Sequence, residues 1–139
     1  MSLVFFTDRD LGKVFPGILK VAGLDVVRHA DRFAPDCPDE EWLEHVGRDR
    51  LVAITHDARI RYKPNELAAV RNHGVTLLVV VGKAPFPILA RNFVATLPRI
   101  EHFLEERKPP LIAKIYRATP LELLRNPDSP GSVDLWYPR

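Results

Sequence analysis

Carboxylate side chains gather at three places in the first half of the sequence. Asp8 and Asp10 follow a short apolar run, and Asp57 follows another. Between them, Asp39 and Glu40 stand where a helix should begin. Like charges held close together raise one another's pKa, and a hard divalent cation such as Mg²⁺ or Mn²⁺ removes that cost. A water bound to such a cation can attack a phosphodiester, so these residues predict metal-dependent hydrolysis.

The apolar pattern indicates which elements would bring the acids together. Short apolar runs predict strands over residues 3–7, 24–28, 51–55, 75–81 and 111–117. Helical spacing predicts helices over residues 11–22, 38–47, 65–73 and 86–107. This alternation is typical of an α/β three-layer sandwich with a mainly parallel central sheet of about five strands. Strand ends and helix starts then lie along one edge of the sheet, where the acids would meet.

Polar residues and prolines set the expected helix boundaries. Asp10 and Asn65 are the predicted N-caps of the first and third helices, and Pro38 suits the first position of the second. Pro98 falls inside the long fourth helix, where we expect a kink or a break because proline removes a hydrogen bond.

The C-terminal segment has a different character. We divide the chain into a catalytic domain over residues 1–117 and a tail over residues 118–139, which packs on that domain or on a partner. The tail contains four prolines and little core pattern, although residues 132–137 could form a last short strand. Trp136 and Tyr137 could dock a partner or a second subunit, so a homodimer is possible.

Composition limits the class of protein. The 139 residues suit one domain, and 46% hydrophobic with 27% charged residues is ordinary for a globular chain. No apolar run reaches the roughly 20 residues of a membrane helix, and no signal peptide is visible. Cys37 is the single cysteine and cannot form an internal disulfide. We therefore expect a cytoplasmic protein without a membrane partner.

Charge is distributed unevenly along the sequence. Residues 1–57 contain 7 basic and 11 acidic side chains, whereas residues 58–139 contain 13 basic and 7 acidic ones. Arg59, Arg61 and Lys63 follow the last acid and could hold the scissile or flanking phosphates of a polyanion, with a solvated basic loop as the alternative. Tyr62 among them could stack on a base, although packing against the protein is the expectation.

The sequence resembles PIN-domain ribonucleases, in particular the compact PIN-like proteins related to VapC toxins. The resemblance covers residues 3–82. The residues on which it rests are Phe6-Thr7-Asp8 at the end of the first strand, Asp39 at a helix start, and Thr55-His56-Asp57 after a later strand.

This resemblance implies a function. It implies a PIN-like fold and a Mg²⁺- or Mn²⁺-dependent endoribonuclease whose metal ligands are Asp8, Asp39 and Asp57. It also implies the toxin of a toxin–antitoxin pair, restrained by an antitoxin protein. Such domains usually add a glutamate ligand from helices that this sequence lacks, and we favour Asp10 and Glu40 over Glu41 as its replacement. Thr55 could orient Asp57 or a metal-bound water.

Two other classes of function remain open at this stage. A receiver-like signalling domain also has acids after its first strand and an Asp after its third. It needs a Thr or Ser after the fourth strand, where this sequence has Gly82-Lys83. A catalytically inert PIN-like module that binds RNA or protein is the other alternative. The remaining histidines are scattered and expected on the surface: His29, His45, His73 and His102.

Overall fold

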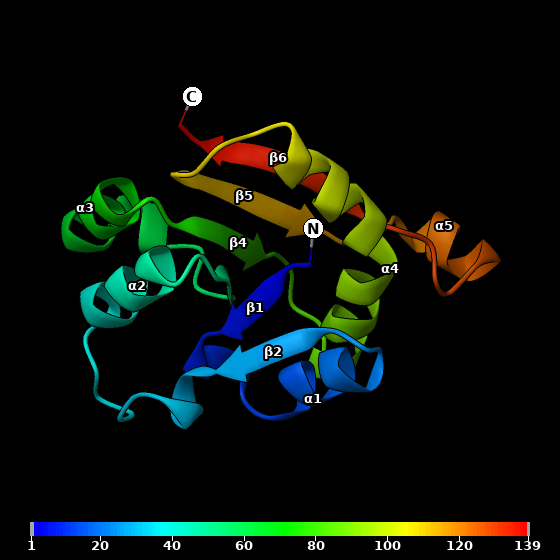
Figure 1. The fold of residues 1–139 in the computed structure, drawn as a ribbon. Coiled ribbons are helices and arrows are strands. Elements are labelled where there is room, and N and C mark those ends of the chain that lie inside the picture. The colour runs from blue at the N-terminus through cyan, green and yellow to red at the C-terminus, as the bar shows by residue number, and fades with distance from the viewer. Residues whose placement is uncertain (1, 139) are drawn as a thin grey trace.

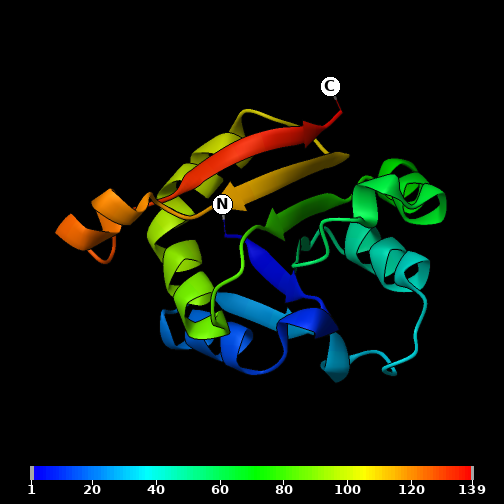
Figure 2. The same cartoon turned by 180° about the vertical axis from the view of Figure 1, so that it is seen from behind.

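The computed structural model of the protein describes residues 2–138, apart from the side chain of Arg61. One sheet is formed by β1 (Val4–Thr7), β2 (Asp25–Arg28), β3 (Val52–Thr55), β4 (Thr76–Val80), β5 (Leu111–Tyr116) and β6 (Ser132–Tyr137). On one face lie α1 (Val14–Val21) and α4 (Phe86–Glu105), and on the other α2 (Asp39–Arg48) and α3 (Pro64–His73) (Figure 1; Figure 2). The predicted three-layer α/β sandwich is therefore confirmed.

The strand order explains why the acids can meet. The sheet runs β2-β1-β3-β4-β5-β6, and all neighbours pair in parallel except the antiparallel pair of β5 and β6. The chain leaves β1 for β2 on one side and returns to β3 on the other. In parallel sheets such a reversal opens a crevice at the carboxyl ends of the strands, where ligands bind.

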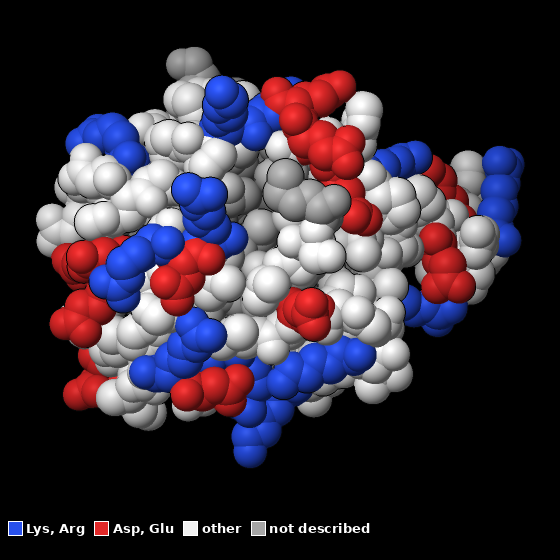
Figure 3. Space-filling view, viewed as in Figure 1, with Lys and Arg blue, Asp and Glu red and all other residues white. Residues whose placement is uncertain are grey.

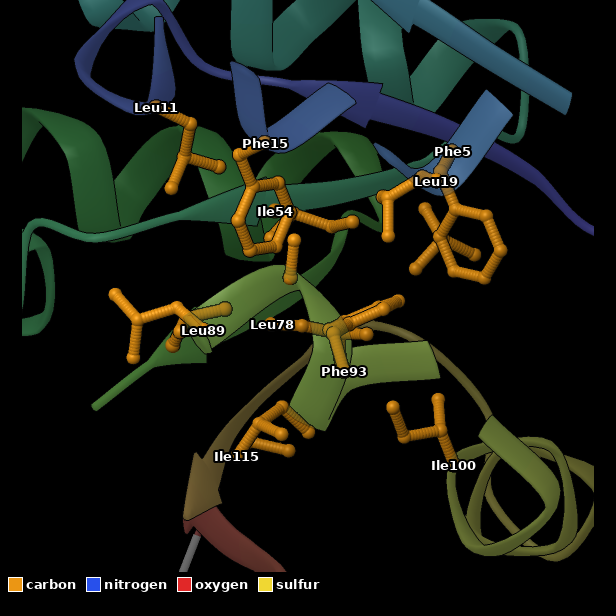
Figure 4. Close-up of a cluster of buried hydrophobic side chains, with 14 of the residues drawn as sticks. Phe5, Leu11, Phe15, Leu19, Ile54, Leu78, Leu89, Phe93, Ile100 and Ile115 are labelled. Carbon is orange, nitrogen blue, oxygen red and sulfur yellow. The ribbon is translucent and has the colours of Figure 1, made fainter. Parts of the chain in front are cut away.

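Two phenylalanines of β1 anchor the two helix layers. Successive side chains of a strand point to opposite faces of the sheet. Phe5 therefore packs on α4, where its ring meets Phe93 edge to face at 5.6 Å between centroids (Figure 4). Phe6 faces the other layer and stacks on Trp42 of α2 at 5.4 Å. The strand that ends at Asp8 is thus fixed from both sides.

The first helix begins later than predicted. Arg9–Leu11 form a short 3₁₀ turn, η1, and Gly12 follows with a φ of 64°, so α1 starts only at Val14. The prediction of Asp10 as an N-cap is wrong. The cap of η1 is Asp8, whose Oδ1 accepts the Arg9 N–H at 2.8 Å. The carboxylate of Asp10 can instead accept hydrogen bonds from groups at the end of β3.

Three other features of the helices differ from the prediction. Lys63 takes the N-cap position of α3, with Pro64 as its first residue, so Asn65 is not the cap. Pro38 precedes α2 instead of opening it. Pro98 does not break α4, which continues from residue 86 to residue 105.

The C-terminal segment contains more structure than predicted. The strand expected over residues 132–137 is present as β6. A helix, α5 (Pro120–Arg125), precedes it and projects from the body of the protein (Figure 1; Figure 2). Its N-terminus has a capping box, in which Thr119 and Glu122 bond to each other's backbone N–H. The sequence carries this motif as Thr119-Pro120-Leu121-Glu122.

The uneven charge of the sequence does not form two separate surfaces on the face seen in Figure 3, where acidic and basic side chains intermix. Over residues 2–138, no helix has both the length and the apolar character that crossing a membrane requires.

A close contact between helices sets the position of α2 beside α3. A Cβ added at Gly47 would overlap the carbonyl oxygen of His73, which is backbone and cannot swing aside. The two helices therefore approach as closely as they do because residue 47 has no side chain. Asp39 begins α2 and Lys63 directly precedes α3, so both belong to the pair of helices whose spacing this contact sets.

We predict that Gly47→Ala lowers the free energy of unfolding by about 1–3 kcal/mol, the usual cost of overpacking. The matched control is Gly17→Ala in α1, where an added Cβ meets nothing within 4 Å and φ is ordinary. That change should raise stability by about 0.5–1 kcal/mol, because alanine favours a helix over glycine. Urea unfolding followed by circular dichroism measures both. Equal effects of the two substitutions would contradict the close-contact explanation.

Candidate functional site

A hollow of about 530 Å³ opens at the carboxyl ends of β1 and β3, and we call it the acidic hollow. Its acids come from three segments: Asp8 and Asp10 after β1, Asp39 at the start of α2, and Asp57 after β3. It is also lined by Arg9, His56, Ala58, Arg59 and Lys63. The position is the crevice that the strand order creates. The predicted Asp8, Asp39 and Asp57 thus share one hollow.

Thr55 ties the first two acids to the end of β3. Its hydroxyl donates to Asp8 Oδ2 at 2.9 Å and lies 3.2 Å from Asp10 Oδ2. The hydroxyl oxygen accepts the backbone N–H of Asp57 at 3.1 Å. Asp10 Oδ2 also accepts the backbone N–H of His56 at 3.1 Å. A single buried hydroxyl therefore positions acids from both strands.

Burial disturbs the ionisation of this pair. Burial, reinforced by the charge of Asp10, raises the pKa of Asp8 to about 7, against a lowering by the Thr55 hydrogen bond. Burial likewise raises the pKa of Asp10, against hydrogen bonds from the His56 backbone and Thr55. The two carboxylates are therefore costly to ionise together, and a nearby cation would relieve that cost.

Asp57 has partners of opposite charge. Its Oδ2 accepts from Lys63 Nζ at 2.9 Å, and its Oδ1 lies 3.2 Å from Arg59 Nε. Burial acts to raise the pKa of Asp57, but the hydrogen bonds from Lys63 and Arg59 outweigh it and leave the pKa below its ordinary value. Two of the residues predicted to bind phosphate are thus engaged with the third predicted metal ligand.

Asp39 is oriented by a buried aromatic side chain. The Trp42 indole N–H donates to Asp39 Oδ1 at 2.9 Å, one turn further along α2. Trp42 is fully buried and stacked on Phe6, so it holds this oxygen firmly and leaves Oδ2 for another partner. The sequence pattern does not indicate this hydrogen bond between Trp42 and Asp39.

Two histidines lie close to the acidic hollow. The His56 ring lines it, with Nε2 2.8 Å from the carbonyl oxygen of Gly82. His29 is only 1% exposed, so its predicted surface position is wrong. Burial, together with the charge of Arg9, lowers the pKa of His29 and favours a neutral ring. Within the described part of the chain, its Nε2 has no hydrogen-bond partner.

Some predicted site residues do not line the acidic hollow or lie outside the described residues. Glu40 is half-buried beside Asp39 but is not among the residues that line the acidic hollow. The side chain of Arg61 lies outside the described residues. Arg9 lines the hollow and was missed, although its place between two candidate acids could have indicated it.

The chemistry of this set of donors suits a hard divalent cation. Carboxylate oxygens are the ligands that Mg²⁺ and Mn²⁺ prefer. However, no three His, Cys, Asp or Glu side chains between residues 2 and 138 are grouped closely enough to hold a metal ion. The ion pairs of Asp57 give a physical reason, because this carboxylate is turned toward cations of the chain itself.

A second hollow lies between α1 and α4 and has a different character. Its lining is apolar, formed by residues such as Ile18, Val21 and Val94, with the ion pair of Arg91 and Asp128 beside them. It lacks the set of oxygen ligands that a hard cation requires. We therefore place the candidate chemistry in the acidic hollow.

Comparison with known proteins agrees with the fold. The family model of the PIN-like domain matches residues 3–82, which is more than half of the chain. The chain therefore belongs to the PIN-like domain family, a nuclease type of fold, and the receiver-like alternative loses its support. No curated protein gives a match, and no solved structure does. The narrower relation to VapC toxins stays a prediction.

The raised pKa of Asp8 predicts a pH-dependent effect of Asp8→Asn. The folded protein binds a proton at Asp8 more tightly than the unfolded chain, whose pKa lies near 3.8. The free energy of unfolding of the parent should therefore fall as pH rises from about 4 to about 7. Above about pH 7 the full loss of stability is reached. The asparagine avoids this loss. It should raise the melting temperature in EDTA at about pH 8, and the gain should shrink toward about pH 4.

Thermal unfolding of the two proteins across this pH range measures the difference, in which other titrating groups largely cancel. Asp25→Asn is the matched control, since Asp25 is exposed at the start of β2. If Asp8→Asn and the parent keep a constant difference between these pH values, Asp8 does not have a raised pKa.

Proposed function

We propose that this PIN-like chain is a metal-dependent endoribonuclease that hydrolyses RNA phosphodiester bonds. The observation that supports it is the convergence of Asp8, Asp10, Asp39 and Asp57 on one hollow at the switch point of the sheet. Clustered acids that repel one another are costly without a function, and a divalent cation is the usual means of removing that cost.

Asp8, Asp39 and Asp57 would hold Mg²⁺ or Mn²⁺. When bound, the cation supplies a water of lowered pKa and neutralises charge on the phosphate under attack. Thr55 fixes the carboxylate of Asp8, and Trp42 fixes one oxygen of Asp39, so both acids are oriented before any ligand arrives. Such orientation reduces the cost of forming the productive geometry.

Asp10 has a separate role in this proposal. It shares the Thr55 hydroxyl with Asp8, and burial raises its pKa, so it accepts a proton more readily than an ordinary aspartate does. Glu40 would assist from the first turn of α2, although it lies outside the lining of the hollow. Its contribution remains a prediction.

Arg59 and Lys63 would exchange partners when RNA binds. In the free protein they neutralise Asp57. A phosphate group offers them a new partner of the same charge, and their departure would leave Asp57 to the metal. Arg61, between them in the sequence, would add to the same basic segment.

The resemblance to VapC toxins extends the proposal to partners. The chain would be a cytoplasmic toxin restrained by an antitoxin protein, and a homodimer would be its possible assembly. Restraint could act by placing a further cation near Asp57, in the way that Lys63 already does.

A catalytically inert PIN-like binding module is the second candidate. The observation that favours it is the ion pairing of Asp57, together with the lack of a preformed three-residue metal site between residues 2 and 138. The two candidates share the RNA surface and differ in whether a phosphodiester is broken.

Cleavage of a mixed RNA pool with Mn²⁺, Mg²⁺ or EDTA separates the two candidates. We predict hydrolysis with either metal and none in EDTA. Asp8→Asn and Asp57→Asn should each lower the rate by about 100-fold or more, because each removes a ligand of the activating cation. Asp25→Asn, outside the acidic hollow, should leave the rate unchanged. Cleavage that persists in EDTA, or in both site variants, would contradict the proposal.

Lys63→Met tests the competition at Asp57 without relying on catalysis. Removing the ammonium should strengthen Mn²⁺ binding by about fivefold, equivalent to about 1 kcal/mol for a partly exposed ion pair. The same substitution should weaken RNA binding, which loses a phosphate contact. Calorimetry with Mn²⁺ alone measures the first effect. Lys20→Met, on the exposed side of α1, is the control. Weaker Mn²⁺ binding by Lys63→Met would overturn the competition.

A further inference from the structure

An exposed aromatic side chain stands next to the acidic hollow. Tyr62 packs against the protein through the Trp136 ring, as expected, but its side chain is still 70% exposed. It lies in η3 (Ile60–Tyr62), directly before Lys63, whose ammonium reaches Asp57. Single exposed apolar residues are common on protein surfaces and need no explanation by themselves. The surroundings of this tyrosine are what distinguish it.

The ring of Tyr62 packs against a second aromatic ring. It meets the Trp136 ring edge to face, with 5.7 Å between centroids and 82° between planes. Trp136 belongs to β6 and is only 5% exposed. The Lys114 ammonium lies 4.0 Å from the centre of the Trp136 ring. Tyr62, Trp136 and Lys114 therefore form a supported surface, which we call the aromatic platform.

The sheet fixes the distance between this platform and the acids. Thr55, Val79 and Lys114 are in register on β3, β4 and β5, with their side chains on the same face. Neighbouring strands lie about 4.7–4.9 Å apart, so Lys114 is about 10 Å from Thr55. Thr55 is where the carboxylates meet. The platform is thus close enough for nucleotides that flank a phosphate in the acidic hollow.

Positively charged side chains lie around the path between the aromatic platform and the acidic hollow. The Arg59 side chain is 81% exposed and Lys63 partly so, while Lys114 lies within the platform itself. Proteins that bind single strands combine such cations, which follow the phosphates, with aromatic rings on which bases stack. The combination matches unpaired nucleic acid.

We propose that the aromatic platform is a base-stacking subsite beside the acidic hollow, where Tyr62 receives an unpaired base that flanks the phosphate under attack. This inference rests on the proposed ribonuclease function. A base in a duplex has both faces covered by its neighbours, so Tyr62 could reach it only if the strand opened. Every base has a π face, so stacking here should tolerate different sequences.

Binding in EDTA tests the platform apart from cleavage. The probes are a short labelled oligoribonucleotide and the same strand annealed to its complement. The parent should prefer the single strand. Tyr62→Ala should weaken single-strand binding by about 5- to 100-fold, and Tyr62→Phe should retain it, because stacking needs the ring and not the hydroxyl. Leu124→Ala, which trims an 82% exposed apolar side chain on α5, is the matched control and should have no effect.

A fluorescent base gives a readout that loss of folding alone would not imitate. An oligoribonucleotide that contains 2-aminopurine should be quenched on binding to the parent and to Tyr62→Phe, but not when bound to Tyr62→Ala. Equal binding of single strand and duplex, or an unchanged affinity of Tyr62→Ala, would overturn the proposal and assign the platform to another partner, such as a protein. If the parent cleaves nothing with any metal but shows the Tyr62 dependence, the nuclease proposal fails and the platform stands.

Discussion

The hydroxyl of Thr55 is the contact on which the site depends. It contacts the carboxylates of Asp8 and Asp10, which follow the neighbouring strand β1. It also accepts the backbone N–H of Asp57. Two acids held this close together would otherwise turn apart or bind protons. The parallel pairing of β1 with β3 brings the hydroxyl and the acids together, since Thr7 and Ile54 are direct partners in the ladder. The strand pairing that defines the fold therefore also positions the acids of the site, through Thr55.

The sequence was sufficient for the features that depend on periodicity and on sheet geometry. Alternating strand and helix patterns indicated the three layers, and the rule that strand ends share one edge brought Asp8, Asp39 and Asp57 to one hollow. The match of the PIN-like domain model over residues 3–82 agrees with the family that these motifs suggested.

What the sequence did not indicate depends on contacts between distant residues. No periodicity predicts that Lys63 and Arg59 turn back to Asp57, or that the indole of Trp42 holds Asp39. His29 is buried because Phe6, Phe33 and Trp42 surround it, which only the packed layers determine. The late start of α1 has a local cause in the positive φ of Gly12, which the helical pattern of its neighbours concealed.

The contact of Gly47 with His73 has a consequence for the timescale on which the site responds. With no space between them, α2 and α3 form one block that leaves neither helix free to slide. A ligand that takes Asp57 from Lys63 and Arg59 needs only side-chain rotation, because both ion pairs are formed by side-chain atoms. Rotamer changes of exposed side chains take picoseconds to nanoseconds, whereas shifts of packed helices take microseconds or longer. Access to Asp57 is then governed by how strongly a ligand competes, and not by waiting for the scaffold to open.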